Sequence, residues 1–428
     1  MADRGRDWRS ILLGLASLAS ALFAFVVAGL MILYSVFEPV HTDLSQTVST
    51  TLQAVVIASG MMLSGAVFLP AAYYSLQRLR GVDIPKATPK ILKLWQGVLL
   101  LLLWSGSAVL AQLLVDNDIL KWVTPPLYLL AIGTPVYSLV RLAAGGLNAG
   151  SRQRLWGIPA ATIVLGTTLS IFAEGTLLIL GLVGGVVYLG LHPELISFLR
   201  QIANQITNAS SIDSALKTVE PLLNNPLIIL LALLFFSGLT PVIEETAKSI
   251  AAWAVFDHLG SPAQGFVIGA LSGAGFGLVE SLLASASPDS SWAATLMIRG
   301  GSTMMHILTA SITGWGIASL RTNKSIRRVI GSYAMAVFLH SLWNAAVIMI
   351  VFGGLRISAK FGSTDPIGTV LVFFGISVLV ILCLAIPLTL GFTNRWFRTT
   401  SASPPIIASG ENLGNLGQKP GGDLEGVQ

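Results

Sequence analysis

The chain has 428 residues, of which 54% are hydrophobic and only 11% are charged, and its formal net charge is +5. So small a charged fraction excludes an ordinary soluble globular protein. Several apolar runs exceed the ~20 residues that cross a bilayer, so the sequence predicts an all-α, polytopic transmembrane helical bundle of about 10 to 12 membrane segments. The single cysteine, Cys383, excludes an intrachain disulfide and a cluster of cysteine metal ligands. The basic residues are spread over loops, so we expect a lipid bilayer and no nucleic acid as partner.

Residues 1–156 are predicted to form an N-terminal accessory membrane region. Its four expected spans lie at about 11–37, 51–76, 95–115 and 120–140. The first is too long for a signal-peptide core and lacks a clear cleavage site, so it is expected to be retained. Lys and Arg gather before the first span and between the second and third, which predicts a cytoplasmic N-terminus. No span holds a charge at its centre, which indicates packing, lipid contact or partner binding rather than chemistry.

Residues 157–224 are predicted as a second part. The apolar run 157–191 would be a helix of about 52 Å, which is longer than the membrane is thick. Glu174 and Gly175 lie at its middle, so the run is either one long tilted helix or a hairpin that turns at Glu174. We favour the turn. Residues 192–224 are polar and amphipathic, and they predict surface helices outside the hydrocarbon.

Residues 225–393 are predicted as a membrane domain that is richer in polar groups. Its expected spans lie at about 225–239, 262–286, 295–320, 327–352 and 366–393. Glycines recur every four residues in the second of these, at Gly265, Gly269, Gly273 and Gly277. Such a smooth face lets another helix backbone approach closely. Residues 394–428, rich in Ser, Pro, Gly and Asn, predict a disordered cytoplasmic tail.

Ionisable side chains lie well inside the apolar spans of this domain. They are Glu244, Glu245, Lys248, Glu280, His306 and His340. At the centre of a bilayer each charged side chain costs ~2.5–3.5 kcal/mol, so such a group is retained only when it faces a partner, a metal or a wet cavity. An intramembrane cluster of this kind therefore indicates a functional site.

The residue types point to a metal centre. Carboxylate and imidazole ligands without thiolate suit a catalytic zinc, which keeps three protein ligands and a water. We predict that His306, His340 and at least one of Glu244 and Glu245 bind a divalent metal, with zinc the first candidate. The other glutamate would act as general base on the water. Taken alone, however, either histidine is more typical of a hydrogen bond between helices.

Three further residues are assigned to this site. Lys248 is one helical turn beyond Glu244 and is predicted to pair with one of the two carboxylates. Glu280 would complete or orient the ligand set, although alone it could equally be a proton-relay or packing carboxylate. Asn344 follows His340 by one turn, and its amide could bind metal, orient the water or stabilise an oxyanion.

Four motifs in order resemble those of the PrsW family of membrane proteases, which are distant relatives of the CAAX prenyl proteases and bacteriocin-processing membrane proteins. The resemblance covers about residues 225–352. The motifs are Glu244-Glu245 with Lys248, Phe276 with Glu280, His306 with Gly314, and His340 with Trp343 and Asn344. Arg299 also matches a basic residue often found before the first histidine. Ser281 departs from the family pattern, which usually has Asn after the glutamate.

The resemblance implies an intramembrane metal-dependent endopeptidase with the two adjacent glutamates and the two histidines at its centre. It also implies a bacterial plasma membrane and a membrane-anchored protein substrate, which in relatives can be an anti-sigma factor. Two other functions remain open. A proton- or ion-coupled transporter would keep the same groups in the membrane, but no inverted repeat of the charged segment is evident. A non-catalytic peptide-binding scaffold is the other, and no motif residue is lost to favour it.

The predicted depths of the glutamates shape the expected topology. A single helix through residues 225–257 would place Glu244 near one membrane face, far from Glu280. Gly238 to Pro241 is typical of a helix break, because proline starts or kinks helices. We therefore predict that Glu244 and Glu245 open a new helix, and that residues 225–239 form a separate segment. This arrangement requires the turn at Glu174.

Overall fold

The computed structural model describes residues 7–37, 44–208, 218, 221–222, 224–289, 291–359 and 365–401. All regular secondary structure in these residues is helical, and nine of their helices are long and apolar enough to cross a membrane. The predicted all-α polytopic bundle is therefore confirmed.

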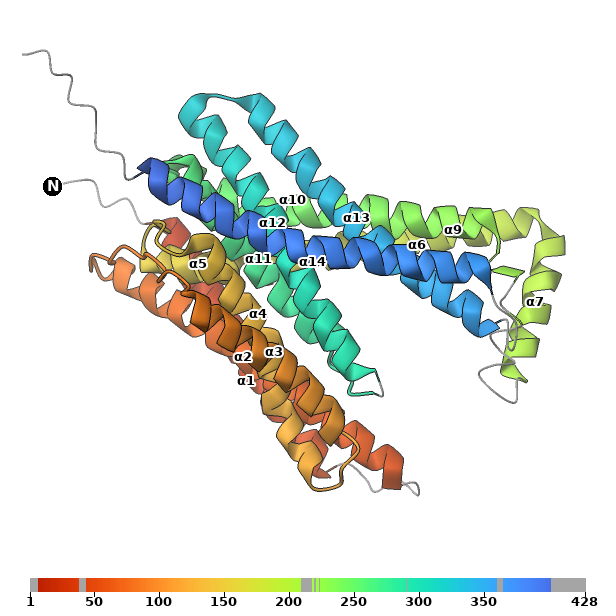
Figure 1. Cartoon of the computed structure of the whole chain (residues 1–428). Coiled ribbons are helices and arrows are strands. Elements are labelled where there is room, and N and C mark those ends of the chain that lie inside the picture. The colour runs from red at the N-terminus through yellow and green to blue at the C-terminus, as the bar shows by residue number, and fades with distance from the viewer. Residues whose placement is uncertain are drawn as a thin grey trace, which may run out of the picture.

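The N-terminal bundle consists of α1 (Trp8–Phe37), α2 (Leu44–Leu79), α3 (Leu94–Leu114) and α4 (Thr124–Ala144), with a 3-10 turn, Leu120–Val123, before α4. The four helices lie together at the lower left of Figure 1. The buried face of α1 is made of Ser10, Ser17, Ala21, Ala24 and Ala28, while its leucines and phenylalanines point outward. Small residues on the inner face let the helices approach closely, and the large apolar side chains are left for lipid.

The run after this bundle is one continuous helix, so the favoured turn at Glu174 is wrong. Its parts are α5 (Arg152–Ala161), a π-helical segment (Thr162–Gly166) and α6 (Thr167–Leu191). In a bilayer an unbroken helix satisfies every backbone polar group, and no proline follows Pro159 to interrupt it. The Ser170 hydroxyl donates a hydrogen bond to Glu174, 2.7 Å away, so the carboxylate is accommodated inside the helix.

The segment that carries the two adjacent glutamates is also unbroken. The segment consists of α9 (Pro226–Ala232), a π-helical segment (Leu233–Leu239) and α10 (Thr240–Ala254). A separate helix, α7 (Pro193–Thr207), precedes it in the chain. The predicted break before Pro241 is therefore wrong, and a π-helical turn replaces it. Proline removes one backbone N–H and crowds the preceding turn, and the wider π turn accommodates both changes without ending the helix. In Figure 1, α6 and α9 reach away from the N-terminal bundle toward α7.

Helix α11 (Pro262–Ala284) lies at the core of the bundle. Of the residues in its most apolar stretch 83% are buried, compared with 22% in the corresponding stretch of α1. α12 (Trp292–Asn323) runs antiparallel along its glycine face. A Cβ atom would collide with the carbonyl of Ala310 at Gly269 and with that of His306 at Gly273. The predicted close approach is confirmed. α12 runs alongside α11, although it is not among the nine helices that are long and apolar enough to cross a membrane.

The last two helices are α13 (Ile326–Ala359) and α14 (Pro366–Ser401). α14 continues to Ser401, so residues 394–401, which were predicted to begin a disordered tail, are helical. The remainder of that predicted tail, 402–428, lies outside the described residues.

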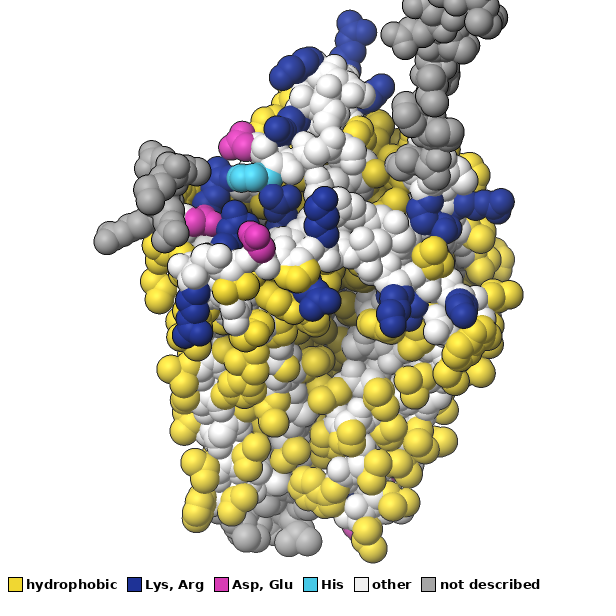
Figure 2. All heavy atoms as spheres, turned by 90° about the vertical axis from the view of Figure 1, so that its left-hand side faces the viewer, with side chains coloured by type: hydrophobic (Ala, Val, Ile, Leu, Met, Phe, Trp, Pro, Cys, Tyr) yellow, Lys and Arg dark blue, Asp and Glu magenta, His cyan; other side chains and the backbone are white. Residues whose placement is uncertain are grey.

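Basic side chains gather at one end of the bundle, above a broad hydrophobic belt (Figure 2). Arg9 of α1 lies 3.4 Å from the carboxylate of Asp257. Arg321 of α12 donates to the Asp257 carbonyl at 2.7 Å, and Arg154 of α5 donates to the His258 carbonyl at 3.3 Å. The starts of α1 and α5 and the ends of α10 and α12 therefore meet at the same end, which is the arrangement that the loop charges predict.

Candidate metal centre

Four helices carry the predicted cluster into the interior. α10 supplies Glu244, Glu245 and Lys248, while α11, α12 and α13 supply Glu280, His306 and His340 respectively. Glu244, Glu245, Lys248 and both histidines are each 6% exposed or less. The Glu280 side chain is 32% exposed, so it forms the accessible edge of the cluster.

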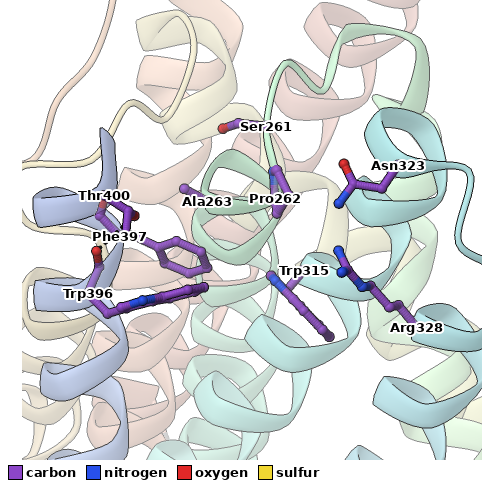
Figure 3. Close-up of a pocket in the computed structure, with 9 residues that line it drawn as sticks. All are labelled: Ser261, Pro262, Ala263, Trp315, Asn323, Arg328, Trp396, Phe397 and Thr400. Carbon is purple, nitrogen blue, oxygen red and sulfur yellow. Dashed lines mark hydrogen bonds between the residues drawn. The ribbon is translucent and has the colours of Figure 1, made fainter. Parts of the chain in front are cut away.

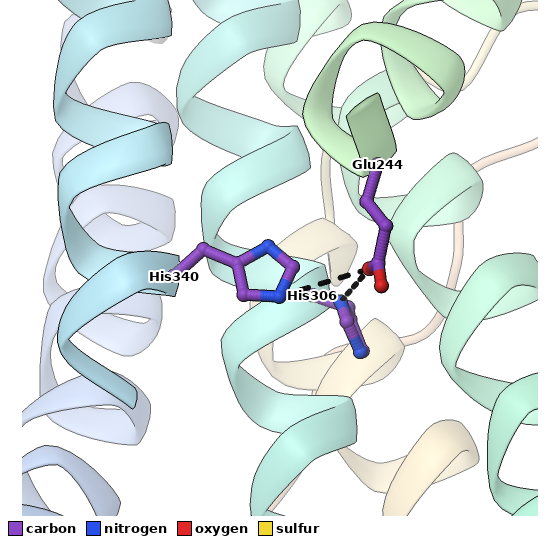
Figure 4. A group of neighbouring side chains, drawn as sticks. All are labelled: Glu244, His306 and His340. Atoms are coloured by element: carbon purple, nitrogen blue, oxygen red, sulfur yellow. Dashed lines mark ion pairs between the residues drawn. The ribbon is translucent and has the colours of Figure 1, made fainter. Parts of the chain in front are cut away.

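Glu244, His306 and His340 form a compact triangle of possible ligand atoms (Figure 4). The Glu244 Oε2 atom lies 3.8 Å from His306 Nδ1 and 3.7 Å from His340 Nε2. One ligand atom from each of the three lies within 4.8 Å of the other two. One carboxylate and two imidazoles are the donor set of many catalytic zinc sites, so these residues fit a divalent metal.

Each histidine is held on its other nitrogen by a second carboxylate. His340 Nδ1 lies 2.8 Å from Glu245 Oε1, and His306 Nε2 lies 2.5 Å from Glu280 Oε2. Glu245 Oε1 also accepts a hydrogen bond from the Thr309 hydroxyl at 3.1 Å. Carboxylates in this position fix the ring orientation and tautomer of a metal-binding histidine. The triangle therefore has the supporting contacts that a metal site needs.

Lys248 is the positive charge of the cluster. Its ammonium group donates to Glu244 Oε2 at 3.1 Å and to Glu245 Oε1 at 2.8 Å, so it pairs with both carboxylates rather than with one. It also donates to His306 Nδ1 at 2.6 Å, and it lies 4.4 Å from the ring centroid of Phe276. This ammonium offsets the burial of two adjacent negative charges.

Helix direction explains how the glutamates converge although both flanking helices are unbroken. In an α-helix each Cα–Cβ bond tilts toward the N-terminus. α10 and α11 are consecutive, and only residues 255–261 separate them, so the Glu244 and Glu280 side chains lean toward each other from antiparallel helices. The His306 imidazole then bridges the remaining gap, with Nδ1 toward Glu244 and Nε2 toward Glu280.

Asn344 is not brought into the cluster. Its amide nitrogen donates to the carbonyl of Phe236, 2.8 Å away, in the π-helical segment before α10. Trp343 is buried, and its ring packs where a Cβ atom of Gly301 would lie. Ser281, the departure from the family pattern, makes a hydrogen bond with Thr303 at 3.1 Å between α11 and α12. All three residues tie helices together around the cluster.

The motifs did not reveal two polar contributors. Thr309 follows His306 by three residues, so helical periodicity places both on one face and could have indicated it. Glu174 comes from α6, which packs beside α10. The sequence could have indicated Glu174, because it is a single carboxylate in the long apolar run 157–191.

Fold and site together define a polytopic membrane protein with a buried carboxylate–imidazole cluster suited to a metal. Residues 214–382, about two fifths of the chain, match the model of the PrsW family intramembrane metalloprotease, which confirms the resemblance seen in the motifs. This is a family of membrane peptide hydrolases, and the match supports that activity here. No curated protein and no solved structure matches the chain.

Proposed function

We propose that the protein is an intramembrane endopeptidase in which Glu244, His306 and His340 hold a divalent metal, with zinc the first candidate. The observation that carries this proposal is the triangle of ligand atoms together with a carboxylate behind each imidazole. When bound, such a metal lowers the pKa of water and polarises a peptide carbonyl. The remaining steps fall to the side chains around it.

Glu280 is the general base in this proposal. A base must reach both the attacking water and the substrate. Glu280 Oε2 is buried against His306 and Arg299, so Oε1 is the oxygen that acts in this proposal. The Glu280 side chain is 32% exposed, whereas those of Glu244 and Glu245 are 8% and 0% exposed. Arg299 lies 2.8 Å from Glu280 Oε2 and favours its ionised form. This assignment differs from the sequence prediction, which gave the role of base to one of the two adjacent glutamates.

Glu245 and Lys248 act as positioning residues. Glu245 holds His340 through Nδ1, which leaves Nε2 directed at Glu244. Lys248 occupies His306 Nδ1 through a hydrogen bond, so metal binding requires the ammonium to give up that bond and keep its two carboxylates.

The substrate is a membrane-anchored protein segment, because the cluster is buried among apolar helices and Glu280 is its accessible edge. An anti-sigma factor in a bacterial plasma membrane is the first candidate, on the strength of the motif resemblance. The basic end that joins α1, α5, α10 and α12 faces the cytoplasm in this proposal, with both termini on that side.

The test measures the metal content of the purified full chain and the cleavage of a co-reconstituted single-pass protein tagged on both sides of its membrane segment. Glu244→Ala should lose both metal and cleavage. Glu245→Gln and Glu280→Gln should each weaken metal affinity about 10- to 100-fold, because each carboxylate holds an imidazole. Only Glu280→Gln should stay inactive when excess metal restores full occupancy. A metal-free wild type that still cleaves would overturn the mechanism. A metal-free wild type that cleaves nothing but carries an ion flux would replace the peptidase by a transporter.

A further inference from the structure

A cavity of about 370 Å³ lies at the basic end of the bundle, apart from the metal centre. It opens between the start of α11, the end of α12, the start of α13 and the end of α14 (Figure 3). Trp315 and Arg328 line one side, and Trp396 and Phe397 line the other. Aromatic rings at the ends of membrane helices are typical of the interface between hydrocarbon and headgroups.

The cavity is positively charged. The Arg328 guanidinium lies 5.7 Å from the ring centroid of Trp315, and no carboxylate is among the residues that line the cavity. The first turn of α11, with Pro262 and Ala263, lines one side of the cavity. The positive end of the α11 dipole therefore lies beside the cavity. The sequence places further basic residues on the adjoining helix ends, at Arg321, Lys324 and Arg395.

An exposed apolar stripe continues from the cavity along α14. Trp396, which lines the cavity, is 50% exposed, and Phe392, Leu388 and Leu384 follow it at four-residue spacing with exposures of 75%, 73% and 65%. Residues four apart lie on one helix face. The stripe therefore leads from the headgroup level toward the middle of the membrane.

We propose that this cavity binds the headgroup phosphate of an anionic phospholipid, with Arg328 contacting the phosphate and an acyl chain lying along the α14 stripe. A basic pocket between helix ends attracts an anionic headgroup. A free phosphate would gain nothing from the aromatic lining or from the stripe, whereas a lipid contacts both. The site is independent of the peptidase proposal, since none of its lining residues belongs to the metal centre.

The test uses quenching of Trp396 fluorescence by brominated lipid. The full chain is reconstituted in phosphatidylcholine discs that contain a minor fraction of phosphatidylglycerol, with bromine on either one lipid or the other. The Trp396 signal is the difference between wild type and Trp396→Phe. The brominated anionic lipid should quench it about five-fold more effectively than an equal amount of brominated phosphatidylcholine, as expected for one basic contact.

Arg328→Gln should abolish this preference, and Arg328→Lys should retain most of it. Arg327→Gln is the matched control, because Arg327 is an exposed neighbour that does not line the cavity, and it should keep the preference. Equal quenching by the two lipids in the wild type, or a preference that survives in Arg328→Gln, would overturn the proposal. Displacement of the lipid by millimolar inorganic phosphate would also overturn it, since the occupant would then be an anion.

Discussion

The bundle α1–α4 and the group α10–α13 are both built from apolar helices, yet the second also buries a cluster of carboxylate, ammonium and imidazole side chains. α1 turns Ser and Ala inward and leaves its large apolar residues outside. α10 buries two carboxylates and an ammonium, and α12 and α13 each bury an imidazole. Polar burial in a membrane is costly unless the groups meet partners, so the second arrangement persists where function requires it.

Helix α11 shows how the second region tolerates these groups. Its glycine face brings α12 so near that His306 is reached by carboxylates from both α10 and α11. In α1 the small residues Ala21, Ala24 and Ala28 let neighbouring helices pack closely, whereas in α11 small residues also set the separation of ionisable groups. Close helix packing and polar chemistry are thus linked in this half of the protein.

The largest expected effect is loss of either imidazole. His306→Ala or His340→Ala should lower cleavage roughly a thousand-fold, since a metal contributes several kcal/mol to the transition state. The double variant should be no worse, because the groups act as a unit. Cleavage rate and bound metal are the measurements. His192→Ala, at the junction between α6 and α7 and outside the cluster, is the control. Additive losses would mean that the two imidazoles serve different steps.

The next effect concerns the buried ammonium. Lys248→Met leaves two carboxylates without their cation, which should destabilise the fold by about 3–5 kcal/mol. Adding Glu245→Gln should recover part of that loss, as measured by thermal unfolding in detergent. The single variant should also lose less cleavage than loss of either adjacent glutamate. An equal or greater loss in a folded Lys248→Met protein would assign Lys248 a direct catalytic role.

A smaller effect distinguishes the close α11–α12 contact from the open surface of α3. Gly269→Ala places a methyl group against the Ala310 carbonyl, so overpacking should cost about 1–3 kcal/mol and reduce cleavage. Gly106→Ala in α3 is the matched control, because a Cβ atom there meets open space. It should be neutral or stabilise the helix by up to ~1 kcal/mol. Equal melting temperatures for the two variants would show that the α11–α12 contact tolerates expansion.

The smallest effect tests where the functional region ends. Glu174 lies outside residues 214–382, yet its helix α6 packs beside α10, which carries the two adjacent glutamates. Glu174→Gln keeps the side-chain shape and removes one negative charge, so cleavage should fall by about two- to ten-fold, consistent with an interaction of up to about 1.4 kcal/mol. Ser170→Ala, which removes the hydroxyl that bonds Glu174, should give a smaller change in the same direction. No change in either variant would confine the chemistry to the matched segment.

The sequence by itself determined the helical class, most of the spans and the six ionisable residues of the cluster. Apolar runs of membrane length can only be helices here, because lipid offers no hydrogen-bond partner to the backbone. The spacing of Gly265, Gly269, Gly273 and Gly277 also predicted the helix contact that the structure contains. These features are local, so they are readable without tertiary information.

Tertiary structure alone decided how the chain passes through the site and which oxygen meets which nitrogen. The pattern at Glu174 and Pro241 allowed a turn or a break, and packing kept both helices continuous. Glu244 and Glu245 are adjacent in sequence, yet their contacts differ. Glu244 faces both imidazoles in the triangle, whereas Glu245 contacts the Nδ1 atom of His340. Asn344 likewise contacts Phe236 instead of the cluster. Successive residues on a helix point about 100° apart, so their roles depend on which neighbouring helix each one faces.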